Sequence, residues 1–183
     1  MGGRTPPSVP MAARPSAARP LAALVLLGSG LALIVSGCDS AGTDTPTVEA
    51  SADPWVEMLD AVNAARAAGQ TCGAEAYPPA GPLVWNDRLE AAAAAHTGDM
   101  VRNSYFAHAG TDGSDVGARA SREGYAWRVV GENIARFQRT VPEVVEDWVQ
   151  SPSHCRNLMD PRFAEMGADE QDRYWTQVFG LAR

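Results

Sequence analysis

The chain of 183 residues contains no lysine, so all 15 of its basic residues are arginines, and 22 acidic residues outnumber them. The formal net charge is −7. A nucleic-acid-binding protein needs a clustered basic surface, which this composition does not offer. Loose electrostatic adhesion to anionic lipid is disfavoured for the same reason. We therefore expect no nucleic-acid partner.

Residues that commonly carry chemistry are also few. The chain has only three histidines, His96, His108 and His154, and only three cysteines. It lacks the Gly-x-Ser-x-Gly nucleophile elbow and the His-Glu-x-x-His motif of zinc proteases. These absences disfavour the hydrolases that the two motifs define.

The N-terminal segment is typical of an export signal. Arginines at 4, 14 and 19 precede an apolar run over residues 21–35. Val35-Ser36-Gly37-Cys38 resembles a bacterial lipobox, after which Cys38 becomes the lipid-modified first residue. We expect residues 1–37 to be the signal peptide, with either Met1 or Met11 as the start. An ordinary cleaved signal and a membrane anchor remain alternatives, although the run is short for a spanning helix.

The segment 38–52 contains small residues, Pro and acids but no aromatic side chain, so it is expected to be a disordered tether. Residues 53–183 have the length of one domain with one core. Without a leader that carries three arginines and no acid, the net charge becomes about −10. We expect an exported monomer, attached to a cell envelope membrane only through its N-terminal lipid.

Cys72 and Cys155 are the two cysteines left for the domain, and in an exported protein a pair is most simply a disulfide. A metal site that uses Cys155 beside His154 is the alternative. Adjacent residues rarely both reach one metal ion, so we favour the disulfide.

Periodicity and capping residues predict the elements of the domain. Asp53-Pro54 begins a helix that Gly69 ends, and Thr140 with Glu143 forms a capping box. The segment 71–82 is expected to be a loop. Further helices are expected over 86–103, 114–123, 140–150 and 152–158, and strands over 127–135, 165–170 and 173–180. This order predicts an α+β domain with a small sheet between helices.

Gly131-Glu132-Asn133-Ile134-Ala135 places a carboxylate in a strand-like apolar run. An ionised carboxylate there needs a partner or a polar cavity. The histidines are the candidate partners we considered. Hydrogen bonds to backbone amides are the structural alternative for Glu132, and His96 is expected to have a packing or structural role.

An ordered series of motifs spans nearly all of residues 55–181, and it resembles the CAP superfamily: cysteine-rich secretory, antigen 5 and pathogenesis-related proteins. The series comprises Asn63-Ala64-Ala65-Arg66, Leu83-x-Trp85-Asn86, His96-Thr97-x-Asp99-Met100, Phe106-Ala107-His108, Gly131-Glu132-Asn133-Ile134, Trp148-x-x-Ser151-Pro152-x-His154 and Tyr174-Trp175-Thr176-Gln177.

The resemblance implies an α-β-α sandwich with an open cleft lined by two His and two Glu. His108 and Glu132 match the first histidine and the first glutamate. Ser151 and Tyr174 stand where the second glutamate and the second histidine fall, so half of the set is missing. We expect the side chains of His108 and Glu132 to lie within about 6 Å of each other.

Other residues are candidates to complete the cleft. His154 supplies a second imidazole, and strand alternation puts Thr176 on the same face as Tyr174. With His108 and His154 as the only candidate metal ligands, the set is short of the three protein ligands of a catalytic zinc site. Any zinc or other divalent cation is therefore expected to bind weakly.

The resemblance fixes no single activity. The first hypothesis is a binding module for a small polar, lipid or metal-linked ligand of the envelope. The second is a peptidase-like hydrolase with Glu132 as general base, which requires a nucleophile such as Ser151 or a metal-bound water. The third is a purely structural envelope protein. We rank them in this order, which leaves enzymatic activity open.

Overall fold

The structure is a computed structural model, and it describes residues 53–183. The predicted leader, the tether and Cys38 lie outside the described residues. In the described part of the chain, no helix has the length and apolar character needed to cross a membrane.

The centre of the domain is a four-stranded sheet with the strand order β3-β5-β6-β4. β4 (Trp127–Arg136) pairs antiparallel with β6 (Tyr174–Ala182), which pairs antiparallel with β5 (Glu165–Gln171). The short strand β3 (Val84–Trp85) joins parallel to β5. β4 is thus an outer strand, and Glu132 lies directly opposite Val178 of β6.

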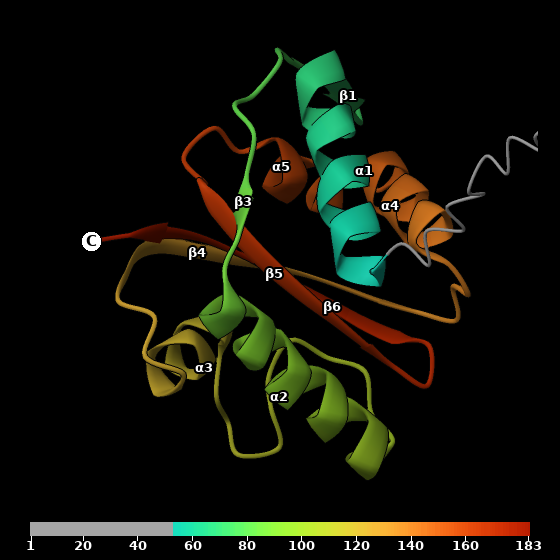
Figure 1. Ribbon diagram of the computed structural model, residues 1–183. Coiled ribbons are helices and arrows are strands. Elements are labelled where there is room, and N and C mark those ends of the chain that lie inside the picture. The colour runs from blue at the N-terminus through green and yellow to red at the C-terminus, as the bar shows by residue number, and fades with distance from the viewer. Residues whose placement is uncertain (1–52) are drawn as a thin grey trace, which may run out of the picture. The chain divides into compact units, whose positions relative to one another are not determined.

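Within residues 53–183, five helices cover the two faces of the sheet, so the expected α-β-α sandwich is confirmed (Figure 1). One face carries α1 (Pro54–Ala68), α4 (Val141–Gln150) and α5 (Pro152–Met159), and the other carries α2 (Asp87–Asn103) and α3 (Val116–Arg122). The predicted N-caps are present: Asp53 accepts from the Trp55 amide at 3.0 Å, and Thr140 accepts from the Glu143 amide at 3.4 Å. The Glu143 carboxylate accepts from the Arg139 amide at 2.7 Å, one residue before the N-cap amide of a capping box.

Each face of the sheet has its own apolar core. The larger core surrounds Trp148 and Phe179 under α1, α4 and α5. The smaller one joins Leu89 and Ala93 of α2 to Val178 of β6. Side chains directly opposite each other on paired strands point to the same face, so Glu132 shares the α2–α3 face with Val178.

The buried Arg66 ties α1 to α5 in the same layer and to the loop before β3. Its guanidinium donates to the carbonyls of Leu158 at 2.6 Å, Asp160 at 3.1 Å and Gly81 at 2.7 Å. Hydrogen bonds to three backbone carbonyls satisfy a buried charge that would otherwise be costly. The Arg of the first family motif is therefore a structural residue.

The expected loop over 71–82 is the main error in the predicted elements. The structure has a hairpin there, made of β1 (Gln70–Cys72) and β2 (Glu75–Tyr77). A two-residue turn joins the strands, and its first residue, Gly73, has a positive φ of 72°. Glycine at the first position of such a turn supplies the positive φ that the turn needs.

The predicted disulfide is confirmed. Cys72 of β1 is bonded to Cys155 of α5, with a Cα–Cα distance of 5.4 Å. The bond closes a sequence separation of 83 residues and holds the small hairpin against the helical layer. It also answers the alternative of a Cys155 metal site, because a bonded sulfur is no thiolate ligand.

Candidate functional site

Glu132 lies near the middle of β4 and is only 6% exposed, while His108 lies in the loop after α2 with a side chain that is 59% exposed. The Glu132 Oε1 atom is 2.8 Å from the His108 Nδ1 atom. The two groups are therefore in contact, well inside the expected distance. Since a carboxylate only accepts, Nδ1 carries the proton and the other ring nitrogen of His108 remains free for a ligand.

The second oxygen of Glu132 is occupied by a residue that the sequence analysis did not identify. Arg119 of α3 donates from Nη2 to Oε2 at 2.7 Å, and both side chains are 3% exposed. A charge-assisted pair of this kind offsets the cost of burying the carboxylate. The alternative of Glu132 bonded to backbone amides is thus wrong. The buried Glu indicated the need for a partner, but the sequence predicted only histidines in that role.

Arg119 also fixes the loop that carries His108. It donates from Nη2 to the His108 carbonyl at 3.1 Å and from Nη1 to the Ser114 carbonyl at 2.8 Å. The helix that positions it is capped by Asp115, which accepts from the Ala118 amide at 2.7 Å. One guanidinium therefore sets both the carboxylate and the backbone of the histidine that contacts it.

Asp99, near the end of α2, anchors the same loop. It accepts from the Tyr105 hydroxyl, from Asn103 at 2.8 Å, and from the Thr111 amide and hydroxyl at 2.8 and 2.7 Å. Burial by itself raises the pKa of Asp99, but these hydrogen bonds together outweigh it and lower the pKa to about 2. The carboxylate is therefore ionised throughout the neutral range.

His96 of α2 lies beneath the site and is fully buried. Its Nε2 atom is 2.9 Å from the Ala107 carbonyl and 3.8 Å from the Glu132 Oε1 atom. Burial lowers the pKa of His96. Its hydrogen bond to the backbone agrees with the expected structural role.

His154 of α5 approaches His108 from the opposite layer of the sandwich. Burial lowers the pKa of the half-buried His154, and the charge of the nearby His108 lowers it further. Contacts with β4 hold this helix: Asn133 donates to the His154 carbonyl at 3.2 Å, and Asn157 donates to the Glu132 carbonyl at 3.0 Å. His108 and His154 are therefore close enough for their charges to interact, and both lie beside the outer strand β4.

The other three candidate residues take different positions. Thr176 is fully buried and accepts from Thr97 of α2 at 2.9 Å, so it lies inside the sandwich and does not line an open cleft. Tyr174 packs edge-on against Phe106, two residues before His108, with ring centroids 6.3 Å apart. Ser151 is the N-cap residue of α5, and its hydroxyl is 3.4 Å from the Ser153 hydroxyl.

The donor set at the site does not fit a firmly held zinc ion. Both Glu132 oxygens and one nitrogen of His108 are already engaged with protein groups. In residues 53–183, no three His, Cys, Asp or Glu side chains are grouped to hold a metal ion. Two imidazoles remain, one fewer than catalytic zinc sites normally use.

The sequence model of the cysteine-rich secretory protein family, CAP, matches residues 59–179. Together with the sandwich and the His108–Glu132 contact, this match shows that the chain belongs to the CAP family. Two proteins of Bacillus subtilis (strain 168) are similar to it in sequence. YkwD is 37% identical over 101 residues, and the membrane protein YlbC is 29% identical over 97.

These alignments cover 54% and 53% of the chain but only 39% and 28% of the two relatives. The chain therefore spans less than half the length of either protein. Their full activities and partners do not transfer with the shared domain.

Two solved structures support the fold. An extracellular SCP-domain protein from Bacillus anthracis has a TM-score of 0.62 at 25% identity, and the alignment covers 69% of this chain and 40% of that one. An outer surface protein of Borrelia burgdorferi has a TM-score of 0.52 at 21% identity, and the alignment covers 57% of this chain and 80% of that one. At such identity the second likeness shows the fold alone.

Proposed function

We propose that this CAP protein is an exported, lipid-anchored binding module, and that the site formed by His108 and His154 beside β4 holds a small polar or metal-linked ligand. Export is supported by the leader-like N-terminus, by the Cys72–Cys155 bond and by the similarity to a protein described as extracellular. The lipobox motif at Cys38 supports the anchor.

One observation carries the binding role. Glu132 is held between Arg119 and His108, and this arrangement fixes the ring of a histidine whose side chain is 59% exposed. A purely structural ion pair has no need of an exposed imidazole with a free nitrogen. An oriented side chain of this kind is pre-organised for a ligand, because little rotamer entropy is lost on binding.

A hydrolase is the second candidate. A carboxylate orients the histidine that acts as a general base in such enzymes, and Glu132 contacts His108 in the same way. It also requires a nucleophile. In the described part of the chain, no hydrogen bond joins the Ser151 hydroxyl to His108 or His154. This geometry ranks the binding module first, ahead of both the hydrolase and the structural role.

Calorimetric titration with Zn²⁺ tests the site, with zinc serving as a probe for paired imidazoles. We expect a Kd in the micromolar range or weaker, and loss of binding in His108→Ala. The Ser151→Ala variant is the matched control and should bind zinc as the wild type does. Nanomolar affinity, or affinity unchanged in His108→Ala, contradicts the proposed ligand set.

A further inference from the structure

The end of β4 carries a group of aromatic rings around one arginine. The guanidinium carbon of Arg136 lies 4.9 Å from the centre of the Phe106 ring and 4.8 Å from the centre of the Phe137 ring, both within the range of a cation–π contact. Tyr174 packs edge-on against Phe106. Three segments that are distant in sequence, the loop after α2, the end of β4 and the start of β6, therefore form one surface, which we call the aromatic patch.

The aromatic patch is a neighbour of the site proposed above, but it shares no residue with the set His108, Glu132 and His154. Arg136 lies four residues beyond Glu132 on the same face of β4, which corresponds to about 13 Å along the strand. Tyr174 lies directly opposite Arg136 on β6. The patch can therefore be tested independently of the two imidazoles.

Arg136 is exposed, and its charge is not neutralised by a neighbour. Within residues 53–183, no carboxylate forms an ion pair with it and no hydrogen bond engages its guanidinium, although acids outnumber arginines in the chain. Aromatic rings attract the charge but do not replace a hydrogen-bond acceptor, so the five N–H donors remain available. Contact with two rings also restricts a long side chain, which lowers the entropy that a ligand must remove.

Phe137 has a backbone conformation that is rare for a bulky residue. Its φ is 84°, and its ring is 66% exposed, whereas two of the four phenylalanines of the chain are buried. Hydrogen bonds hold the backbone on either side: the Phe137 amide donates to the Arg173 carbonyl at 2.8 Å, and the Gln138 carbonyl accepts from the Trp175 indole at 3.0 Å. The fold thus maintains a strained residue whose ring lies in solvent, and such residues concentrate at functional sites.

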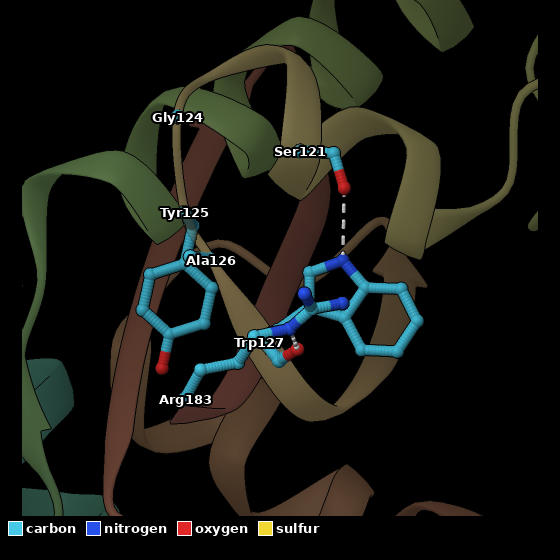
Figure 2. A pocket seen from close by; sticks show the side chains of 6 residues that line it. All are labelled: Ser121, Gly124, Tyr125, Ala126, Trp127 and Arg183. Carbon is cyan, nitrogen blue, oxygen red and sulfur yellow. Dashed lines mark hydrogen bonds between the residues drawn. The ribbon is translucent and has the colours of Figure 1, made fainter.

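Figure 2 shows another arginine that lies beside aromatic rings, and it provides a contrast. Arg183 borders a hollow of about 370 Å³ together with Tyr125 and Trp127. Arg183 donates to the Trp127 carbonyl at 3.0 Å, Trp127 donates to the Ser121 hydroxyl at 2.9 Å, and Tyr125 donates to Glu165 at 2.6 Å. These polar groups already have partners, so this hollow gives no comparable indication of a ligand.

The chemistry of the aromatic patch selects one class of ligand. A planar carboxylate can accept two parallel hydrogen bonds from a guanidinium, and the exposed rings offer apolar surface beside it. Phe137 also lines a hollow of about 320 Å³ with Glu143, Glu146 and Asp147. These acids repel a doubly charged phosphate group about twice as strongly as a singly charged carboxylate.

We propose that the aromatic patch binds a monocarboxylate that carries an apolar group, either the C-terminal residue of a peptide or a small free acid. Arg136 binds the carboxylate, and the rings of Phe106 and Phe137 contact the apolar group. This inference goes beyond the proposed function, because it does not depend on metal or ligand binding at His108 and His154.

NMR titration of the full chain tests this proposal, with N-acetylphenylalanine as the probe and its C-terminal amide and phenyl phosphate as comparisons. We expect N-acetylphenylalanine to shift the amide signals of Arg136, Phe137 and Tyr174 with millimolar affinity, and the two comparison compounds to bind at least about tenfold more weakly. Two further probes distinguish the sources. Tighter binding of N-acetyl-diglycyl-phenylalanine than of 3-phenylpropionate indicates a peptide end, and equal or weaker binding indicates a small free acid.

Arg136→Gln removes the charge and should weaken binding of N-acetylphenylalanine at least about tenfold. Arg128→Gln is the matched control, because Arg128 is exposed on the same strand and, among the described residues, makes no ion pair and no cation–π contact. It should bind normally.

Phe137→Asn separates binding from stability. Asparagine tolerates a positive φ, so we expect this variant to unfold at the same temperature as the wild type or a higher one, while N-acetylphenylalanine binds several-fold more weakly. A structural role of the ring would instead lower the unfolding temperature. Four results overturn the proposal: no response to N-acetylphenylalanine, equal binding of its amide, preference for phenyl phosphate, or full binding by Arg136→Gln.

Discussion

At the scale of single residues, Arg119 has the widest influence on the site. Its two terminal nitrogens bind three groups: the Ser114 carbonyl, the Glu132 carboxylate and the His108 carbonyl. Removing one partner of a buried ion pair leaves an uncompensated charge, which typically costs about 3–5 kcal/mol. Substitutions at Arg119 are therefore expected to lower the stability of the fold, which would obscure any effect on binding. The tests above use other positions for this reason.

Asp99 gives a prediction for pH. Its pKa is about 2 in the folded chain and 3.8 in an ordinary context, so the unfolded chain binds a proton first as the pH falls. The stabilisation by Asp99 is therefore complete above about pH 4 and is lost as the pH falls from 3.8 toward 2. Asp99→Asn should lower the free energy of unfolding by about 1–3 kcal/mol at neutral pH and by much less near pH 2.

Chemical denaturation at several pH values measures this difference. Asp60→Asn is the control, because Asp60 is exposed on α1 and makes no hydrogen bond or ion pair within residues 53–183. A constant difference between wild type and Asp99→Asn from pH 7 down to about pH 2 contradicts the assignment.

At the scale of elements, the close approach of α2 to the sheet determines the shape of the α2–α3 layer. A Cβ atom on Gly167 of β5 would lie 2.1 Å from the Glu90 amide nitrogen and 2.6 Å from the Leu89 carbonyl carbon. These are backbone atoms of α2, so no side-chain rotation relieves the overlap. The run of alanines over residues 91–95 allows the rest of the helix to pack as closely.

Gly167→Ala should therefore destabilise the fold by about 3 kcal/mol or more, because α2 must move away from β5. Thermal and chemical unfolding measure the effect. Gly81→Ala is the matched control, since its Cβ would meet nothing within 4 Å, and it should change stability by no more than about 0.5 kcal/mol. If the two variants are equally stable, α2 does not pack closely against β5.

At the scale of the whole molecule, the chain combines one folded domain with an N-terminal segment outside the described residues. The family match covers residues 59–179, and the domain has its own two cores and its own disulfide. The two parts of the proposed function, the N-terminal anchor and the site of the domain, are therefore tested separately.

The proposed lipid anchor predicts that Cys38→Ser moves the protein from the membrane fraction to the soluble fraction or blocks its processing. The physical reason is that Cys38 is the only lipidation site proposed here and that the acidic domain has little electrostatic attraction to anionic lipid. Fractionation and intact mass measure the change, with Ser40→Ala as the control. Unchanged fractionation and mass in Cys38→Ser rule out the anchor.

The sequence by itself determined most of the elements, the family and the disulfide. Helix caps at Asp53 and Thr140 and the apolar periodicities are local features, so they predicted the helices and the strands of the hairpin β5–β6. The sequence also supplied the Glu132–His108 pair, through matching motifs. Cys72 and Cys155 were predicted to be bonded because they are the two cysteines left for the domain and because export was expected. That prediction needed no knowledge of the fold.

Only the tertiary structure decided which groups complete the site. Arg119 is 13 residues from Glu132 in sequence, and no periodicity links a short helix to a strand, so their pairing depends on how α3 packs on β4. Thr176 has the predicted alternation, but α2 covers it. The hairpin β1–β2 has strands of three residues each, and its disulfide and tertiary packing stabilise it more than its local pattern does. Local patterns specify elements, whereas the partners of a buried charge depend on packing between segments that are distant in sequence.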